Sequence, residues 1–183
     1  MSAPKARVLK SKTVYRGPLF SVRTDYVLEP GVPAGSPTSR RDIIVHGGSV
    51  VLLPVLPTGE ILLVRQYRHS VGQYLWELVA GHIEHGEAPL AAARRELAEE
   101  TGFQARRVRK LLDVFPTPGF LSEHMVVYSC HGLIPGKARP EEDERIEVRR
   151  FKRPELERMM RTGRLRDAKS IASLLYYWRF FAR

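Results

Sequence analysis

The segment from Gly81 to Phe103, GHIEHGEAPLAAARRELAEETGF, constrains this chain most strongly. It places Glu96, Glu99 and Glu100 within one helical turn behind a loop bounded by glycines. On a helix these side chains fall within an arc of roughly 100°, so they converge on one region. Carboxylates packed so closely repel one another unless a cation lies among them, and oxygen ligands suit a hard ion such as Mg²⁺. The segment predicts a divalent-metal site for phosphate chemistry, although three glutamates without this context would usually form only a solvated helix face.

The residues around the glutamates predict a loop, a helix and a second loop. Pro89 suits a first helical turn because its missing N–H would be unpaired there, and Gly102 suits the residue just past a helix end. Leu90, Ala93 and Leu97 recur at i, i+3 and i+7, which predicts an apolar stripe that docks on a sheet. The helix is therefore expected to have a core face beside its acidic face.

This segment resembles the Nudix box. A glycine at position 81 is followed by Glu87 and then by Arg95, whose planar guanidinium could hold Glu87 or another carboxylate in place. The remaining positions follow in register: Glu96, Leu97, Glu99, Glu100, Gly102 and Phe103. So many residue types at fixed spacing form a far more specific signal than a lone glycine motif. Phe103, where an aliphatic residue is more usual, and Ala88, where Ser or Thr would cap the helix better, are mild departures.

The resemblance implies an α+β fold, the Nudix fold, in which a mixed β-sheet is sandwiched between helices over residues 46–183. Residues 1–45 are expected to form an antiparallel β appendage, with strands near Arg7–Arg16 and Leu19–Leu28, and the Pro-, Gly- and Ser-rich residues 30–39 are expected to form a loop. The apolar runs Val50–Leu56 and Ile61–Tyr67 around a Pro-Thr-Gly turn predict a hairpin that seeds the central sheet.

The rest of the chain predicts three more strands and two more helices. The strands are expected near Arg109–Phe115, His124–Leu133 and Ile146–Phe151. The helices are expected at Pro154–Gly163 and Ala168–Phe181, the second with Ile171, Leu174, Leu175 and Trp178 on one apolar stripe.

Composition fits a cytoplasmic enzyme. The chain has 183 residues and 43% apolar content, enough for one sizeable core, and it lacks an apolar stretch of the length a membrane helix needs. The residues MSAPKARVLKSK lack the apolar centre of a signal peptide, so neither export nor a membrane contact is expected. The single Cys130 excludes an internal disulfide and a Cys-based zinc cluster, and it is expected to be a strand residue rather than a nucleophile.

The net charge of +10 raises the question of a nucleic-acid partner. The excess lies largely in residues 5–12, 106–110 and 145–166, and none of these runs interleaves aromatic residues as a base-stacking platform would. We expect a solvated surface that also attracts anionic substrates, and not a nucleic-acid path.

Three features are similar to the ADP-ribose pyrophosphatase branch of the family. The first is VRQYR at residues 64–68, followed by WELVAGHIEHGE; the second is PTPGFLSEHM, which places Pro118 sixteen residues beyond Gly102. The third is the N-terminal strand appendage, which those enzymes commonly exchange between the subunits of a dimer. The resemblance implies a homodimer that hydrolyses ADP-ribose, or a related nucleoside diphosphate sugar, to AMP and ribose 5-phosphate.

Two alternatives remain open. One is a Nudix pyrophosphohydrolase that acts on GDP-mannose, on dinucleoside polyphosphates or on RNA 5′ ends. The other is a binding module that senses ADP-ribose without cleaving it, in which the box carboxylates would be expected to have decayed. Because all of them are present in this chain, catalysis is the better interpretation.

The resemblance implies that a metal-activated water attacks phosphorus with two or three Mg²⁺ ions in place, for which Mn²⁺ can substitute. Glu96 and Glu100 are then the central ligands, Glu99 is an additional ligand or a supporting carboxylate, and the backbone carbonyl of Ala80 completes the coordination. Glu99 and Arg95 also count among the catalytic residues.

The resemblance implies that the general base lies in an acidic loop after the box, which in this chain is PEEDERIEV, residues 140–148. Glu144 is the first candidate because it precedes the Ile-x-Val strand pattern, and Glu142 is the second. The alternative is that the loop is only a solvated acidic segment.

Several residues are candidates for substrate contacts. Arg68, at a strand end, could bind a phosphate through two N–H groups, and Arg41 is a second candidate; either could instead pair with a nearby acid. Glu77 could accept hydrogen bonds from adenine or ribose, or merely cap its strand. Phe20, with Tyr26 as a second candidate, could stack on adenine from the partner subunit, with core packing as the alternative.

Gly119 and Ser122 are expected to shape a loop near the terminal ribose, and Pro118, like Gly119, is a candidate for substrate contact. His82 and His85 lie inside the box loop, and both are expected to be exposed because the chemistry gives them no role.

Overall fold

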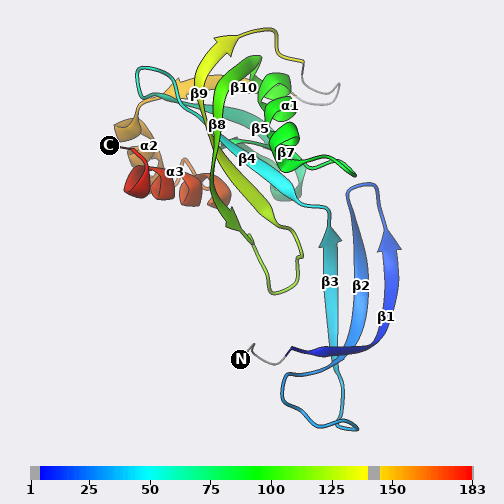
Figure 1. Ribbon diagram of the computed structural model, residues 1–183. Coiled ribbons are helices and arrows are strands. Elements are labelled where there is room, and N and C mark those ends of the chain that lie inside the picture. Colours follow the sequence, from blue (N-terminus) through cyan, green and yellow to red (C-terminus); the bar gives the residue numbers. More distant parts are fainter. Residues whose placement is uncertain (1–4, 140–144, 183) are drawn as a thin grey trace. The chain divides into compact units, whose positions relative to one another are not determined.

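The computed structural model describes residues 5–139 and 145–182, which group into two compact units (Figure 1). The first unit holds the chain up to Gly48 together with Phe115–His124, and the second holds Ser49–Val114 and the chain from Met125 onward. The sequence predicts a boundary after residue 45 and keeps residues 115–124 in the main domain. In the structure this loop groups with the first unit instead.

The first unit is an antiparallel sheet, as predicted, and in its described residues it has three strands, the third of which was not located from the sequence. Its order is β1 (Arg7–Arg16), β2 (Phe20–Leu28) and β3 (Ser39–His46). The loop of residues 115–124 attaches to β3 because the N–H of Ile44 donates to the carbonyl of Phe120 at 2.8 Å, and the N–H of Ser122 donates to the carbonyl of Ile44 at 2.9 Å.

In its described residues, the second unit contains two sheets and three α-helices. The four-stranded sheet has the order β7 (Val79–His82), β4 (Ser49–Pro54), β9 (Met125–Pro135), β8 (Phe103–Val114), and the three-stranded sheet has the order β10 (Glu147–Phe151), β5 (Ile61–Arg68), β6 (Gln73–Glu77). The helices are α1 (Pro89–Thr101), α2 (Arg153–Arg161) and α3 (Ala168–Phe180), and a 3₁₀ turn, η1, spans His69–Val71. Because β4 and β9 pair in parallel and the other pairs are antiparallel, the four-stranded sheet is mixed.

Strand β4 shows why helices cover both faces of this sheet. Its side chains alternate in direction, so Val51 and Leu53 pack in one cluster with residues of α2 and α3, while Val50 and Leu52 pack in another with residues of α1 (Figure 1). All six residues of β4 are buried, as expected for a strand covered on both sides. The predicted mixed sheet between helices is confirmed.

The predicted hairpin is wrong beyond its turn. Val55 and Ile61 form a single antiparallel bridge, and the N–H of Leu56 donates to the carbonyl of Glu60 at 2.9 Å. Beyond this bridge, β4 pairs with β7 and β9, whereas β5 pairs with β6 and β10. Each apolar run is buried and needs a partner on both edges, and those partners come from distant parts of the chain.

Two predicted helix stripes are shifted. Leu90 is 43% exposed, because the inward face of α1 runs through Ala92, Ala93 and Leu97 and leaves the first turn outside. In α3, Leu175 is 51% exposed, and buried Ser170 faces inward, where its hydroxyl accepts a hydrogen bond from the N–H of Leu78.

Cys130 lies in β9 and is fully buried, as predicted for a strand residue. Burial raises the pKa of its thiol to about 12, so the thiol stays protonated and unreactive at neutral pH. In the described ranges, no helix is both long enough and apolar enough to cross a membrane.

Candidate active site

Helix α1 begins and ends where the sequence predicts. Pro89 is its first residue, and Ala88 precedes it in an extended conformation without a side-chain cap. Gly102 follows it with φ of 73° and donates its N–H to the carbonyl of Ala98 at 2.9 Å. That left-handed conformation suits glycine, which has no Cβ to clash. The three box glutamates therefore lie on one regular helix.

Arg95 joins the loop before α1 to the glutamates of the helix. Its Nε and Nη2 bind the two oxygens of Glu87 at 3.1 and 2.9 Å, and Nη2 also donates to the carbonyl of His82 at 2.9 Å. Its Nη1 reaches Oε1 of Glu96 at 2.7 Å and Oε2 of Glu99 at 3.1 Å. The contact between Arg95 and Glu87 that the sequence predicts is present, and it ties the loop to the helix.

These contacts stabilise the charged forms of Arg95 and Glu87. The hydrogen bonds from Arg95 hold the pKa of Glu87 below its ordinary value, against the opposing effect of burial and with help from the N–H of Glu84. The hydrogen bond to Glu87 is the largest cause that raises the pKa of Arg95, ahead of contributions from Glu96 and Glu99. Arg95 therefore stays a cation, and Glu87 stays anionic beside it.

Gly81 brings the backbone of β7 against Glu96. A Cβ at position 81 would lie 1.9 Å from Cδ of Glu96 and about as close to both carboxylate oxygens, so a side chain at this position would displace the carboxylate. Ala80, whose carbonyl is the predicted backbone ligand, precedes Gly81 in the same strand. The glycine at this position is required for a close approach between strand and carboxylate.

The donor set suits a hard divalent ion. Among residues 5–139 and 145–182, no three Asp, Glu, His or Cys side chains form a ready metal-binding group. Arg95 supplies positive charge between Glu96 and Glu99, and Glu100 is buried on the same helix. Carboxylates beside a backbone carbonyl are oxygen ligands of the type that Mg²⁺ accepts.

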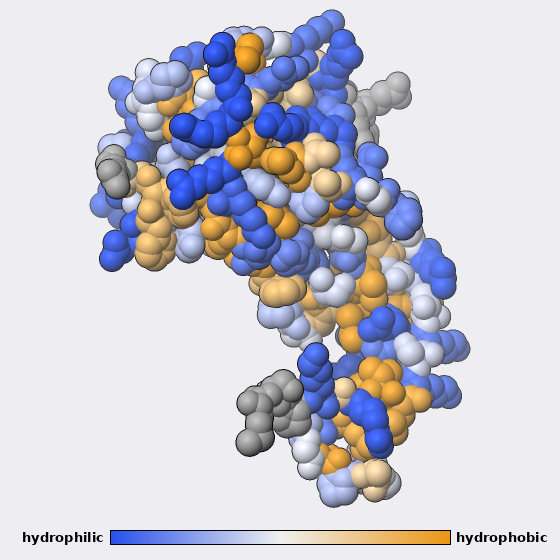
Figure 2. All heavy atoms as spheres, in the orientation of Figure 1, coloured by the Kyte–Doolittle hydropathy of each residue, from blue (hydrophilic) through white to orange (hydrophobic). Residues whose placement is uncertain are grey.

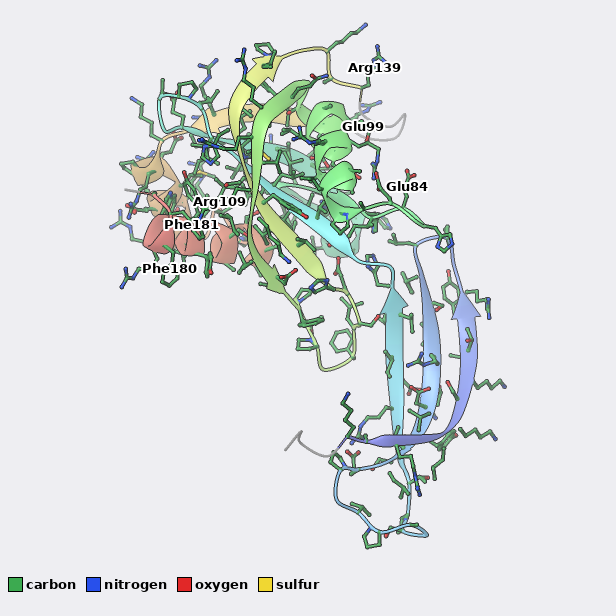
Figure 3. The ribbon with its side chains drawn as sticks, viewed as in Figure 1. Glu84, Glu99, Arg109, Arg139, Phe180 and Phe181 are labelled. Carbon is green, nitrogen blue, oxygen red and sulfur yellow. The ribbon has the colours of Figure 1, made fainter. Side chains whose placement is uncertain are left out.

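The carboxyl end of α1 is joined to the segment after β9. The N–H of Arg139 donates to the backbone carbonyl of Glu99 at 2.9 Å, and the two residues lie close together in Figure 3, with Glu84 in the loop before the helix. Arg139 directly precedes residues 140–144. The two base candidates, Glu142 and Glu144, lie outside the described residues, so their assignment stays a prediction.

Arg68 and Glu77, both predicted to contact substrate, bind each other. Nε and Nη2 of Arg68 donate to the two oxygens of Glu77 at 2.8 and 2.9 Å. Glu77 is 2% exposed and also accepts a hydrogen bond from Lys169, whereas the side chain of Arg68 is 37% exposed. Arg68 can therefore still meet a ligand, but Glu77 is occupied by two cations. The sequence prediction missed Lys169, which lies 92 positions away from Glu77.

The other predicted substrate residues lie in the first unit. Arg41 in β3 is exposed and pairs with Glu29. Phe20 begins β2 with its ring 5.7 Å from that of Tyr15, and Tyr26 is 37% exposed. Pro118, Gly119 and Ser122 belong to the loop of residues 115–124. His82 and His85, expected to be exposed, are so in the second unit.

A family model described as the NUDIX domain matches residues 45–174. This match covers most of the chain and includes α1, with its glutamates, together with Arg68, Glu77 and Gly81. The chain therefore belongs to the Nudix family.

Characterised relatives extend over much of the chain. It is 32% identical over 172 residues to an ADP-ribose pyrophosphatase of Bacillus subtilis (strain 168), covering 92% of each protein. It is 40% identical over 126 residues to an ADP-ribose pyrophosphatase of Mycobacterium tuberculosis, covering 68% of this chain and 59% of that protein. A GDP-mannose pyrophosphatase of Yersinia enterocolitica is 32% identical over 146 residues, covering 74% of this chain and 76% of that protein.

A solved structure of an ADP compounds hydrolase has the same fold. It superposes with a TM-score of 0.81 at 23% sequence identity, covering 98% of this chain and 96% of the other. The similarity includes the N-terminal sheet, because almost the whole chain is covered.

Proposed function

We propose that this chain hydrolyses the pyrophosphate bond of ADP-ribose, or of a related nucleoside diphosphate sugar, to give AMP and ribose 5-phosphate. The observation that carries the proposal is the complete set of box residues arranged around Arg95 and Gly81. Similarity to ADP-ribose pyrophosphatases over nearly the whole chain supports this substrate.

The reaction depends on a divalent metal. We propose two or three Mg²⁺ ions, with Mn²⁺ as a substitute, held by Glu96, Glu100, Glu99 and the carbonyl of Ala80. When bound, such ions neutralise pyrophosphate oxygens and lower the pKa of water. Arg95 orients Glu96 and Glu99, and its contacts with Glu87 and the carbonyl of His82 keep the loop on the helix.

Several further residues are proposed to act on the substrate. Glu144, with Glu142 as the alternative, accepts the proton of the attacking water. Arg68 binds a phosphate oxygen through the part of its guanidinium that remains exposed. In the first unit, Arg41 is a second phosphate contact and Phe20 stacks on adenine across a dimer.

The loop of Pro118 and Gly119 is proposed to lie against the terminal ribose. Open space surrounds Gly119 as far as residues 5–139 and 145–182 show, since apart from its chain neighbours none of them has a heavy atom within 4 Å of a Cβ built there. A sugar could therefore approach this part of the backbone closely, which supports the assignment.

The first unit supports a proposed homodimer. All ten residues of β1 are exposed, including four apolar residues that are each at least half exposed: Val8, Leu9, Val14 and Tyr15. Apolar atoms also reach the surface of this unit in Figure 2. Exposed apolar patches of this kind mark interaction surfaces, and exchange of the sheet between two copies would cover them. Light scattering after gel filtration tests whether the protein is a dimer. We also propose that the protein lies in the cytoplasm.

The direct test is an assay of the purified protein with ADP-ribose and Mg²⁺. AMP and ribose 5-phosphate should appear in equal amounts, and EDTA should stop the reaction. GDP-mannose, a dinucleoside polyphosphate and a capped RNA are the comparison substrates, and GDP-mannose is the second candidate because a GDP-mannose pyrophosphatase is among the relatives. If one of these substrates has a higher kcat/KM than ADP-ribose, that substrate becomes the assigned one. If the protein binds ADP-ribose but forms no product, it is a sensing module.

A further inference from the structure

Glu77 is a buried carboxylate held by two cations. It ends β6, and Arg68 donates to both of its oxygens while Nζ of Lys169 donates to Oε2. A buried carboxylate is costly unless it is paired and hydrogen-bonded. With both cations in place, Glu77 is fully compensated.

Lys169 belongs to a polar clamp at the beginning of α3. Its Nζ also donates to Oδ1 of Asp167 at 2.9 Å, and Oδ2 of Asp167 accepts the N–H of Ser170 at 3.0 Å. The hydroxyl of Ser170 in turn accepts the N–H of Leu78 at 2.6 Å. The start of α3 therefore holds both the side chain of Glu77 and the backbone of the next residue.

The charges in this clamp balance. Arg68 and Lys169 contribute two positive charges, and Glu77 and Asp167 contribute two negative charges. Burial raises the pKa of Glu77, but the hydrogen bonds from Arg68 and Lys169 and their charges outweigh it, so the pKa lies below its ordinary value. Glu77 therefore stays ionised as a fixed anchor for both cations.

Arg68 keeps hydrogen-bond donors for a ligand while it is paired with Glu77. The hydrogen bond to Glu77 is the main cause that raises the pKa of Arg68, and the charges of Glu77, Glu100 and Asp167 also raise it. Two N–H groups of its guanidinium are used on Glu77, and a guanidinium has five, so a phosphate oxygen can bind without breaking the pair.

We propose that Lys169 is a positioning residue that, by compensating Glu77, fixes Arg68 in the orientation that receives a substrate phosphate. The proposal rests on the proposed function, in which Arg68 binds the pyrophosphate. Without Lys169, the buried carboxylate has Arg68 as its only cationic partner in the clamp, and the geometry of that pair is no longer fixed by a third group. Binding of the phosphate then includes the cost of reorienting Arg68.

The test compares Lys169→Met with wild type in steady-state kinetics with ADP-ribose and Mg²⁺. KM should rise about 10-fold, the size expected when a charge-assisted hydrogen bond loses its orientation, while kcat changes less than about 3-fold. Lys169→Arg keeps the charge and should restore KM to within about 3-fold of wild type. The matched control is Lys110→Met, which removes an exposed lysine paired with Asp113 and should change neither constant. A folded Lys169→Met protein with wild-type KM would overturn the proposal.

A charge-balanced double variant covers the case in which Lys169→Met does not fold. The double variant Glu77→Gln with Lys169→Met removes one negative and one positive charge, so the clamp keeps a net charge of zero. Arg68 nevertheless loses the carboxylate that fixes its orientation. The proposal expects a raised KM in this folded variant, and a wild-type KM would overturn it.

Metal-free binding of inorganic pyrophosphate, measured by calorimetry, separates this proposal from the proposed function. Lys169→Met should bind pyrophosphate about 10-fold more weakly than wild type, again the effect of one misoriented charge-assisted contact. If the wild-type protein binds pyrophosphate but does not hydrolyse ADP-ribose, the proposed function fails while this comparison still decides the role of Lys169. Equal affinity in the two proteins, or no binding by wild type, would overturn the role of Lys169.

Discussion

Gly81 lies so close to Glu96 that a Cβ at position 81 would overlap the carboxylate of Glu96, at 1.9 Å from its Cδ. The backbone of Gly81 needs no left-handed conformation, since its φ lies outside the positive range. Glycine is therefore required at position 81 because there is no space for a Cβ, and not because the backbone adopts a conformation that only glycine tolerates. This distinction can be tested separately from the stability of the fold.

Gly81→Ala is expected to lower kcat at least about 10-fold while the melting temperature changes little, because the flexible Glu96 side chain moves aside and leaves its place beside β7. The contrasting variant is Gly59→Ala. Gly59 lies in a turn with φ of 81°, and apart from its chain neighbours no described residue has a heavy atom within 4 Å of a Cβ built there. Gly59→Ala should cost stability, on the order of 1 kcal/mol, and leave kcat unchanged. Full activity of folded Gly81→Ala would show that the position of Glu96 is not critical.

Glu100→Gln is expected to lower turnover at least ~100-fold with a modest effect on folding, because it removes a ligand from a site where metals contribute several kcal/mol to transition-state stabilisation. Glu157→Gln, which breaks an exposed pair with Arg153, serves as the control and should retain full activity. Near-normal turnover of Glu100→Gln would refute the metal assignment.

The pair of Glu87 and Arg95 should make stability depend on pH. The pKa of Glu87 is lowered in the folded protein, mainly by the hydrogen bond from Arg95, so the pair stabilises the fold above the ordinary carboxyl value of about 4.3 and loses this effect as pH falls through the lower folded value. The difference in free energy of unfolding between wild type and Glu87→Gln, measured with urea, should shrink from pH 7 to pH 3. A difference that stays constant with pH would contradict the lowered pKa.

The general base can be identified by comparing two substitutions in the acidic loop. Glu144→Gln is expected to reduce kcat at least ~100-fold, the usual contribution of a positioned base, and Glu142→Gln should leave kcat within about 3-fold of wild type. An unaffected rate in Glu144→Gln together with a large loss in Glu142→Gln would reverse the assignment. Equal, small effects would indicate that neither residue is the base.

Cys130 should resist thiol reagents in the folded protein. Burial raises the pKa of its thiol to about 12, so at pH 8 the reactive thiolate is almost absent and the reagent has no access. Ellman's reagent should release no colour from native protein and one equivalent after denaturation in urea. Rapid reaction of the native protein would mean that β9 opens readily.

The sequence predicted best what depends on neighbouring residues. Pro89 and Gly102 define the ends of α1 because capping acts within a few positions, and the spacing of Glu96, Glu99 and Glu100 places them on one helix face. The close contact between Arg95 and Glu87 was also accessible, since both belong to one motif.

Features that depend on distant partners were not predictable in the same way. The buried strands β4 and β5 flank a good turn, yet they enter different sheets because their partners lie elsewhere in the chain. Lys169 reaches Glu77 across 92 positions, and neither residue carries a local signal for the other. Because Arg68 and Glu77 were each considered separately as substrate contacts, their hydrogen bonds to each other were not predicted.

Strand β8 ends the order of the four-stranded sheet, and four of its consecutive or nearly consecutive residues are basic: Arg106, Arg107, Arg109 and Lys110. If a second molecule added a strand beside β8, its backbone would pack near these basic side chains and would partly remove them from water. This desolvation costs free energy and disfavours the pairing. We therefore expect part of the positive charge of the chain to act without any ligand, by keeping concentrated protein from growing into extended aggregates through this strand.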